Sequence, residues 1–295
     1  MKVKSSLAII TAGILWGCIS LFVKQLNAYG FSAMQVSATR CILTAIMMFI
    51  YILLTKPDAL KIRLKDIWMF IGTGIISLTL FNCCYFYTIE KSQASIAVVL
   101  LYTSPIFVML FSALLFKEKI TLKKIFSLVL CFTGCILVAG LVQNEFTISP
   151  AILAVGICSG IFYALYSIFG IYALRKYDTL TVTLYTFIFA AIANLIIGKP
   201  VEIVEKTIAN PILIPFEIGI AVLCTLLPYL LYTYGLKETP AAKAAILVTT
   251  EPLVGALIGI FVFGDPYNFD KITGILLIFT AVILLSLNKR NSYDI

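Results

Sequence analysis

Hydrophobic residues lie along the chain in runs of about 20, separated by short polar joints. A run of this length lets one α-helix cross the hydrocarbon core of a membrane, whereas barrel strands would alternate polar and apolar residues over about ten positions. The pattern therefore predicts an all-α integral membrane protein with ten transmembrane helices. The expected spans are residues 5–25, 32–54, 67–89, 93–115, 122–142, 149–173, 179–198, 213–236, 241–263 and 270–288.

Pro105 and Pro252 lie 147 residues apart in a chain of 295 residues, each inside an apolar run. Sliding the chain on itself by this offset matches further pairs, namely Trp16 with Tyr163, Ser20 with Ser167, Tyr85 with Tyr232, Gly13 with Gly160 and Thr103 with Thr250. Two repeats are indicated, 1–147 and 148–295, with five spans each. Because five is odd, the copies enter the membrane from opposite sides, and such inverted repeats are typical of secondary transporters.

The composition supports the assignment to a membrane protein and argues against an enzymatic or metal-binding site. Hydrophobic residues make up 61% of the chain and charged residues 12%, against about 25% charged in a soluble domain. Histidine is absent, which removes the commonest general base and metal ligand, and no phosphate loop or nucleophile elbow occurs. Cys131 and Cys135 could share a helix face but have no acidic neighbour for a metal site. We expect free cysteines, no metal, no cofactor and no enzymatic activity.

The net charge of +8 is explained by orientation in the membrane. If the N-terminus is cytoplasmic, sixteen of the 22 Lys and Arg residues fall on the cytoplasmic side and four on the other, as the positive-inside rule requires. We therefore expect a multi-pass protein of the cell membrane with both termini in the cytoplasm. The expected partners are a small-molecule substrate, the lipid bilayer and possible protons, with no nucleic acid, in a monomer or weak homodimer.

Glu251-Pro252 is the least expected pair of residues within the apolar runs. A charged side chain at membrane depth costs roughly 2.5 to 3.5 kcal/mol on insertion scales, so such a residue usually faces a bundle interior or a cavity. Pro252 has no amide hydrogen and leaves the carbonyl of Val248 without its helical partner, which must then be satisfied within the protein. Pro105 predicts the same helix break in the first repeat, at a similar depth.

Polar and aromatic side chains well inside the spans are the candidates for a binding site. Tyr and Trp can equally be interfacial anchors or packing residues, and for Tyr85, Tyr87 and Tyr234, near span ends, we favour that interpretation. Aromatic walls would suit an amphipathic or aromatic solute, or a cation held over a ring. The predicted substrate-binding residues are Trp16, Ser20, Asn82, Tyr102, Ser104, Tyr163, Tyr166, Tyr229, Thr249 and Glu251.

Two kinds of role are open for Glu251. It could pair with a substrate ammonium, or exchange a proton and so couple transport to a proton gradient. Alternatively, it could donate to the Val248 carbonyl or pair with Arg40 or Lys24. We favour the functional role, expect Arg40 to be structural, and expect Lys24 to reach an interface. The repeat partner of Glu251 is Ser104, which does not titrate.

Several motifs together resemble a known family. They are Leu15-Trp16-Gly17, Thr39-Arg40, Ser104-Pro105 with Phe116-Lys117-Glu118, and the stretch from Ala241 through Glu251-Pro252 to Gly264-Asp265. Over nearly its whole length the chain resembles the EamA branch of the drug/metabolite transporter superfamily. The resemblance implies two EamA repeats around a central cavity lined by spans 1, 3, 4, 6, 8 and 9.

One departure from the family pattern concerns the end of the fourth span in each repeat. The family often has Gly-Glu there, and this chain has Lys117-Glu118 and Gly264-Asp265, so we interpret both acids as helix-end features. By resemblance, the expected function is a secondary transporter, an exporter of small organic metabolites such as amino acids. The alternatives are proton-coupled efflux of cationic or aromatic drugs or amines, and a passive channel.

Overall fold

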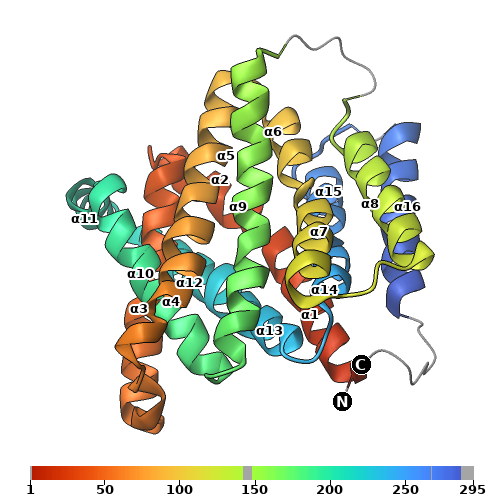
Figure 1. Ribbon diagram of the computed structural model, residues 1–295. Coiled ribbons are helices and arrows are strands. Elements are labelled where there is room, and N and C mark those ends of the chain that lie inside the picture. The colour runs from red at the N-terminus through yellow and green to blue at the C-terminus, as the bar shows by residue number, and fades with distance from the viewer. Residues whose placement is uncertain (1, 142–147, 267, 287–295) are drawn as a thin grey trace.

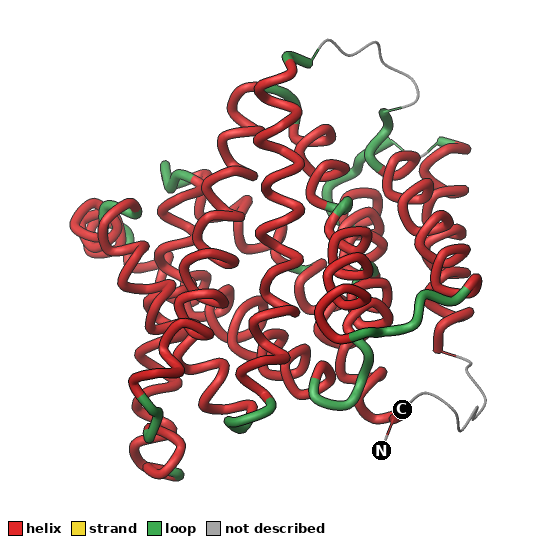
Figure 2. Tube along the Cα trace, viewed as in Figure 1, coloured by secondary structure: helices red, strands yellow, loops and turns green. Residues whose placement is uncertain are grey.

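The computed structural model describes residues 2–141, 148–266 and 268–286, and over these residues it is a bundle of helices without strands (Figures 1 and 2). Within this part of the chain, nine helical stretches are long and apolar enough to cross a membrane. The remaining predicted span, the fifth, is a helix of 17 residues, Leu122–Val138, just under that length. The predicted fold class is confirmed.

Half of the ten spans contain a break in the regular α-helix, so that the ten spans comprise more than ten segments. In chain order they are α1 (Lys2–Gly17) with α2 (Ile19–Ala28); α3 (Ala33–Thr55); α4 (Ile67–Ile71), η3 (Gly72–Thr79) and α5 (Leu80–Lys91); α6 (Ala94–Leu101) with α7 (Ser104–Phe116); α8 (Leu122–Val138); α9 (Pro150–Leu174); α10 (Thr179–Ile197); α12 (Ile214–Ala221), η5 (Val222–Leu226) and α13 (Leu227–Leu236); α14 (Ala241–Leu247) with α15 (Thr250–Phe261); and α16 (Phe269–Ser286). Short helices in the joints are η1 (Pro57–Leu60), η2 (Leu64–Asp66), α11 (Pro200–Ala209) and η4 (Pro211–Leu213).

The helix contacts follow the repeat, because the main contacts between the two halves have equivalents with the halves interchanged. In the second repeat α13 and α15 contact α1, and in the first repeat α5 and α7 contact α9. Likewise α3 packs on its counterpart α10, and α8 on its counterpart α16. The first span of each repeat is therefore held by the third and fourth spans of the other. The predicted boundary between the repeats, after residue 147, borders a stretch outside the described residues.

The two ends of the bundle, here called the basic end and the opposite end, differ in charge. The basic end carries the joints at residues 56–66, 117–121, 175–178 and 237–240, and the opposite end carries those at 29–32, 92–93 and 198–213 (Figure 1). At the opposite end α11 forms a helix where we expected a plain joint. It is held to the start of α3, because Gln35 donates to Glu202 at 2.8 Å and Lys206 donates to Gln35 at 2.7 Å.

The spans that contain Pro105 and Pro252 are both broken, as predicted, between α6 and α7 and between α14 and α15. The breaks lie at matched places, around Tyr102-Thr103 and around Val248-Thr249. The Val248 carbonyl accepts the backbone amide hydrogen of Glu251 at 3.0 Å. The carbonyl is therefore satisfied within the protein, as expected, and the tighter turn supplies a backbone donor in place of the Glu251 side chain.

Two matched glycines allow the breaks to be packed closely. A Cβ atom added to Gly13 would fall on the Thr250 hydroxyl and 2.7 Å from the Val248 carbonyl oxygen. At Gly160 it would fall on the Thr103 hydroxyl and 2.9 Å from the Leu100 carbonyl oxygen. Small residues let transmembrane helices approach in this way. The first span of each repeat thus lies directly against the broken span of the other.

We predict that Gly160→Leu lowers the yield of folded protein and its melting temperature in detergent, because a side chain there must displace backbone. Overpacking of this kind costs about 1–3 kcal/mol. Gly255→Leu is the matched control, since the nearest atom to a Cβ at Gly255 lies 3.9 Å away. Thermal unfolding monitored by fluorescence size-exclusion would measure both. Equal melting temperatures for the two variants would contradict the close packing.

Matched features also occur where each repeat's fourth span ends. Lys117 and Gly264 both have positive φ, 55° and 72°, so a lysine takes a left-handed position that favours glycine. Beyond them, Lys124 pairs with Glu118 at 2.7 Å and Lys271 with Asp265 at 3.6 Å. The interpretation of the two acids as helix-end features is confirmed.

The third span of each repeat contains π-helical turns, η3 and η5, which the sequence pattern does not predict. In each segment a threonine hydroxyl donates to the carbonyl five residues earlier, from Thr79 to Gly74 at 3.0 Å and from Thr225 to Ile220 at 2.9 Å. Such turns are frequent at functional sites. Here η3 also contributes directly to a cavity.

Candidate functional site

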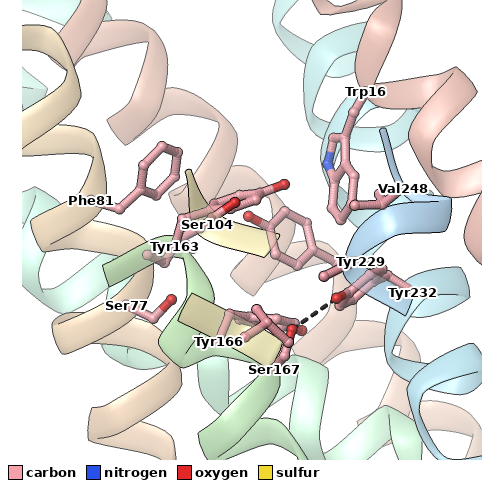
Figure 3. A pocket seen from close by; sticks show the side chains of 13 residues that line it. Trp16, Ser77, Phe81, Ser104, Tyr163, Tyr166, Ser167, Tyr229, Tyr232 and Val248 are labelled. Atoms are coloured by element: carbon pink, nitrogen blue, oxygen red, sulfur yellow. Dashed lines mark hydrogen bonds between the residues drawn. The ribbon is translucent and has the colours of Figure 1, made fainter. Parts of the chain in front are cut away.

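A small cavity lies at the centre of the bundle. Its walls come from spans 1, 3, 4, 6, 8 and 9, the set that the family resemblance implies. Figure 3 shows the lining side chains converging from these helices. They are Trp16, Ser77, Leu78, Phe81, Ser104, Val108, Tyr163, Tyr166, Ser167, Tyr229, Tyr232, Ala245 and Val248.

Aromatic rings form most of one wall. The Trp16 ring meets Tyr229 edge-on at 4.9 Å between centroids and lies 5.6 Å from Tyr232, and Tyr166 meets Tyr229 edge-on at 5.2 Å. Across the cavity Phe81 meets Tyr163 at 5.1 Å. Edge-to-face contacts of this kind add stability beyond area burial and hold the rings in place.

Hydroxyl groups fix two of these tyrosines. Tyr166 shares a hydrogen bond of 2.7 Å with Thr233, and Tyr232 shares one of 2.8 Å with Ser167. The second bond crosses from α9 to α13 and is drawn dashed in Figure 3. The wall is therefore both apolar and equipped with oriented hydroxyls, which suits an amphipathic solute.

Glu251 lies in the first turn of α15, beside the helix break, and its side chain is half-buried. The N-terminus of a helix favours a negative charge. The Tyr163 hydroxyl, which lines the cavity, donates to Oε2 of Glu251 at 3.5 Å. Tyr85 and Tyr102 are also close enough to interact electrostatically with this carboxyl group. Glu251 thus lies just behind the cavity wall, among tyrosines.

Neither basic residue considered as a partner forms an ion pair with Glu251 among the described residues. The Lys24 ammonium lies over the ring of Phe263, 4.1 Å from its centroid. The Arg40 guanidinium is buried near Tyr229 and Cys224 and acts on Glu251 only at longer range. Its Nε has no hydrogen-bond partner in the described chain. Pairing of Glu251 with Lys24 or Arg40 is therefore wrong for this structure.

The structure brings half of the predicted binding residues to the cavity surface. Five of them line it, namely Trp16, Ser104, Tyr163, Tyr166 and Tyr229. The other five, Ser20, Asn82, Tyr102, Thr249 and Glu251, are not among the lining residues.

Each of these five residues has a different environment. Asn82 donates to the Leu78 carbonyl at 2.8 Å, and Thr249 donates to the Ile246 carbonyl at 2.6 Å. Tyr102 packs with Cys135 and Ile278. The polar groups of Asn82 and Thr249 are thus used locally, whereas the Ser20 hydroxyl has no hydrogen-bond partner in the described chain.

Several lining residues lie outside the predicted set. Ser167 and Tyr232 could have been found, because the repeat offset pairs them with Ser20 and Tyr85. Ser77 carried no such signal, since π-helical turns rotate it away from the face that a regular helix predicts. The apolar lining residues Leu78, Phe81, Val108, Ala245 and Val248 are indistinguishable from packing residues in the sequence.

The sequence matches the description "EamA-like transporter family" twice, over residues 3–140 and 150–287. The chain belongs to the EamA-like transporter family. Both matches together cover nearly all of the described bundle. This EamA protein is therefore a multi-pass membrane protein of a transporter family, in agreement with the resemblance drawn from its motifs.

Similar proteins are also named as transporters. The EamA protein is 25% identical to an uncharacterized transporter of Archaeoglobus fulgidus over 94% of each chain. It is 26% identical to the uncharacterized inner membrane transporter YicL of Salmonella typhimurium, over 97% of this chain and 96% of the relative. An uncharacterized transporter of Helicobacter pylori is 28% identical, over 95% of this chain and 93% of the relative. These names denote transporters and no enzyme.

The fold also agrees with a solved structure. A crystal structure matches with a TM-score of 0.77 at 15% identity, covering 95% of each chain. At this identity the likeness concerns the fold alone. The arrangement of ten helical spans is thus shared with an experimentally determined protein, and the side chains of the cavity are this chain's own.

Proposed function

We propose that this EamA protein is a secondary transporter that exports small organic metabolites carrying an amino group, such as amino acids, by alternating access around the central cavity. The observation that carries the proposal is Glu251, a carboxyl group behind an aromatic cavity wall with no ion pair among the described residues. A substrate ammonium would supply the missing positive charge. The ring faces around the cavity would add cation–π attraction.

Arg40 favours amino acids over simple amines. It is a buried cation that forms no ion pair among the described residues, and its Nε has no hydrogen-bond partner there. A solute with both an ammonium and a carboxylate group could be attracted by Glu251 and Arg40 together, whereas a simple amine would use Glu251 alone. Proton-coupled efflux of amines remains the second candidate, since Glu251 could equally exchange a proton with such a cation.

Counterflow in proteoliposomes tests the proposal. Purified protein would be reconstituted with a panel of labelled amino acids and amines on one side and unlabelled solute on the other. We expect uptake that saturates and is stimulated by the unlabelled solute, because a carrier must reorient with each solute bound. Uptake that neither saturates nor responds to trans solute would indicate a passive channel and overturn the proposal.

The orientation is part of the proposal and has its own prediction. Because cytoplasmic joints carry the excess of Lys and Arg, the basic end should face the cytoplasm. In a cysteine-free background, single cysteines at Lys61 and Lys119 should react with impermeant maleimide only from the cytoplasmic side. A cysteine at Lys206 should react only from the other side. Reaction of all three from one side would contradict the assignment.

A further inference from the structure

Two matched pairs of residues have different environments in the two repeats. Ser167 and Tyr232 are 3% and 5% exposed and share a hydrogen bond of 2.8 Å near the basic end. Their counterparts at the 147-residue offset, Ser20 and Tyr85, lie toward the opposite end and are only half-buried. The Ser20 hydroxyl oxygen is buried and has no hydrogen-bond partner in the described chain. One pair is therefore closed and the other is not.

The neighbouring helices have the same asymmetry. In α14, at the basic end, every residue except Lys243 is buried, including the cavity-lining Ala245. In its counterpart α6, at the opposite end, Ala94 is exposed and Val98 and Leu100 are half-buried. The two segments occupy matched positions in the repeats, so they compare the two ends of the cavity directly. The cavity is tightly packed at the basic end and looser at the opposite end.

The closed pair is also connected to the aromatic wall. Tyr232 lies 5.6 Å from Trp16 and 6.0 Å from Tyr166, ring centroid to ring centroid. Tyr85 lies 6.2 Å from Phe81, which meets the cavity-lining Tyr163. Ser167 and Tyr232 thus line the cavity themselves, whereas Tyr85 reaches it through the lining residue Phe81.

We propose that Ser167–Tyr232 and Ser20–Tyr85 are alternating hydrogen-bonded closures of the cavity. The first bond closes the basic end in the present state, and the second forms in the state that opens the basic end. This inference rests on the proposed alternating access. In an inverted pair, the second state arises when the repeats exchange conformations, so that Ser20 and Tyr85 take the arrangement now held by Ser167 and Tyr232. The unpartnered Ser20 hydroxyl then gains its partner.

The proposal requires opposite effects from matched substitutions. Tyr232→Phe removes the bond of the present state only, and Tyr85→Phe removes that of the other state only. A net hydrogen bond changes a two-state population by about 2- to 10-fold. Tyr232→Phe should therefore open the basic end more often, and Tyr85→Phe less often. A purely structural tyrosine would not produce this reversal of sign.

Reporter cysteines at matched positions would measure the shift. In a cysteine-free, folded and transport-active background, Ala245→Cys reports opening of the basic end and Val98→Cys opening of the opposite end. With impermeant maleimide, Tyr232→Phe should raise the labelling rate of the Ala245 reporter about 2- to 10-fold and lower that of the Val98 reporter. Tyr85→Phe should do the reverse. Tyr234→Phe, at an exposed counterpart of Tyr87, is the control and should change neither rate.

Serine variants remove the same hydrogen bonds without changing the tyrosine rings, and so serve as controls for effects of the rings themselves. Ser167→Ala should reproduce Tyr232→Phe, and Ser20→Ala should reproduce Tyr85→Phe. If Tyr232→Phe and Tyr85→Phe shift the reporters in the same direction, or if the serine variants shift neither, the alternating closures are overturned. If the proposed transporter function were wrong, the labelling result would differ from the result that overturns the closures. In a passive channel both reporters of the unsubstituted background would react from both sides at once.

Discussion

Replacing Glu251 with glutamine should leave the protein folded in the membrane and lower kcat/KM for transport by about 10- to 100-fold. The estimate follows from the loss of a charge-assisted interaction worth about 1.5–3 kcal/mol. Glutamine keeps the size of the side chain and can still accept the Tyr163 hydroxyl, so packing should survive. Glu251→Asp should retain part of the activity, because a carboxylate remains one methylene shorter.

Initial rates of export or counterflow across a pH series would measure the effect. Glutamine cannot titrate, so a proton-coupled carrier would also lose the part of its pH response that depends on this residue. Glu217→Gln is a suitable control, because Glu217 is buried in α12 and accepts the Thr207 hydroxyl at 2.6 Å, which glutamine can still do. Normal transport by Glu251→Gln at every pH would refute the assignment of the substrate ammonium to this carboxylate.

Replacing Trp16 with leucine should raise KM about 10-fold and change the maximal rate less. Trp16 holds Tyr229 and Tyr232 in place and presents its ring to the cavity. Aromatic pairs contribute about 0.5–1.5 kcal/mol each, and a cation over a ring contributes about as much. The loss should therefore appear chiefly as weaker solute binding.

The chain offers a matched control in Trp68, its other tryptophan. Trp68 packs against Phe169 and Tyr172 and is half exposed, away from the cavity. Trp68→Leu should leave KM unchanged in the same concentration series of labelled solute. If both variants change KM equally, or if neither does, the aromatic wall does not bind the solute.

The sequence predicted the features of the fold that depend on runs of hydrophobic residues and on prolines, which lack a backbone amide hydrogen. Apolar runs located the spans, and Pro105 and Pro252 located the two helix breaks because proline cannot continue the hydrogen-bond ladder. The repeat offset located the glycines that pack on those breaks, although their contacts needed the structure.

Other features depend on backbone geometry that side-chain patterns do not encode. The π-helical turns of η3 change which residues face inward, so Ser77 lines the cavity unexpectedly. The Val248 carbonyl found its donor in the backbone amide of Glu251, which depends on the local turn. Polar residues such as Asn82 and Thr249 satisfied carbonyls of their own helices, so being polar and mid-span did not by itself place them at the cavity surface.

The contacts of Gly13 and Gly160 have a consequence for how this chain could vary. Each glycine belongs to one repeat, and the atoms that exclude a larger side chain, at Thr250 and Thr103, belong to the other. A change that enlarges one partner can be accommodated only by a change in the opposite half of the gene. The two halves therefore cannot vary independently at these positions, and a lone half would need a second, inverted copy beside it to cover its first helix.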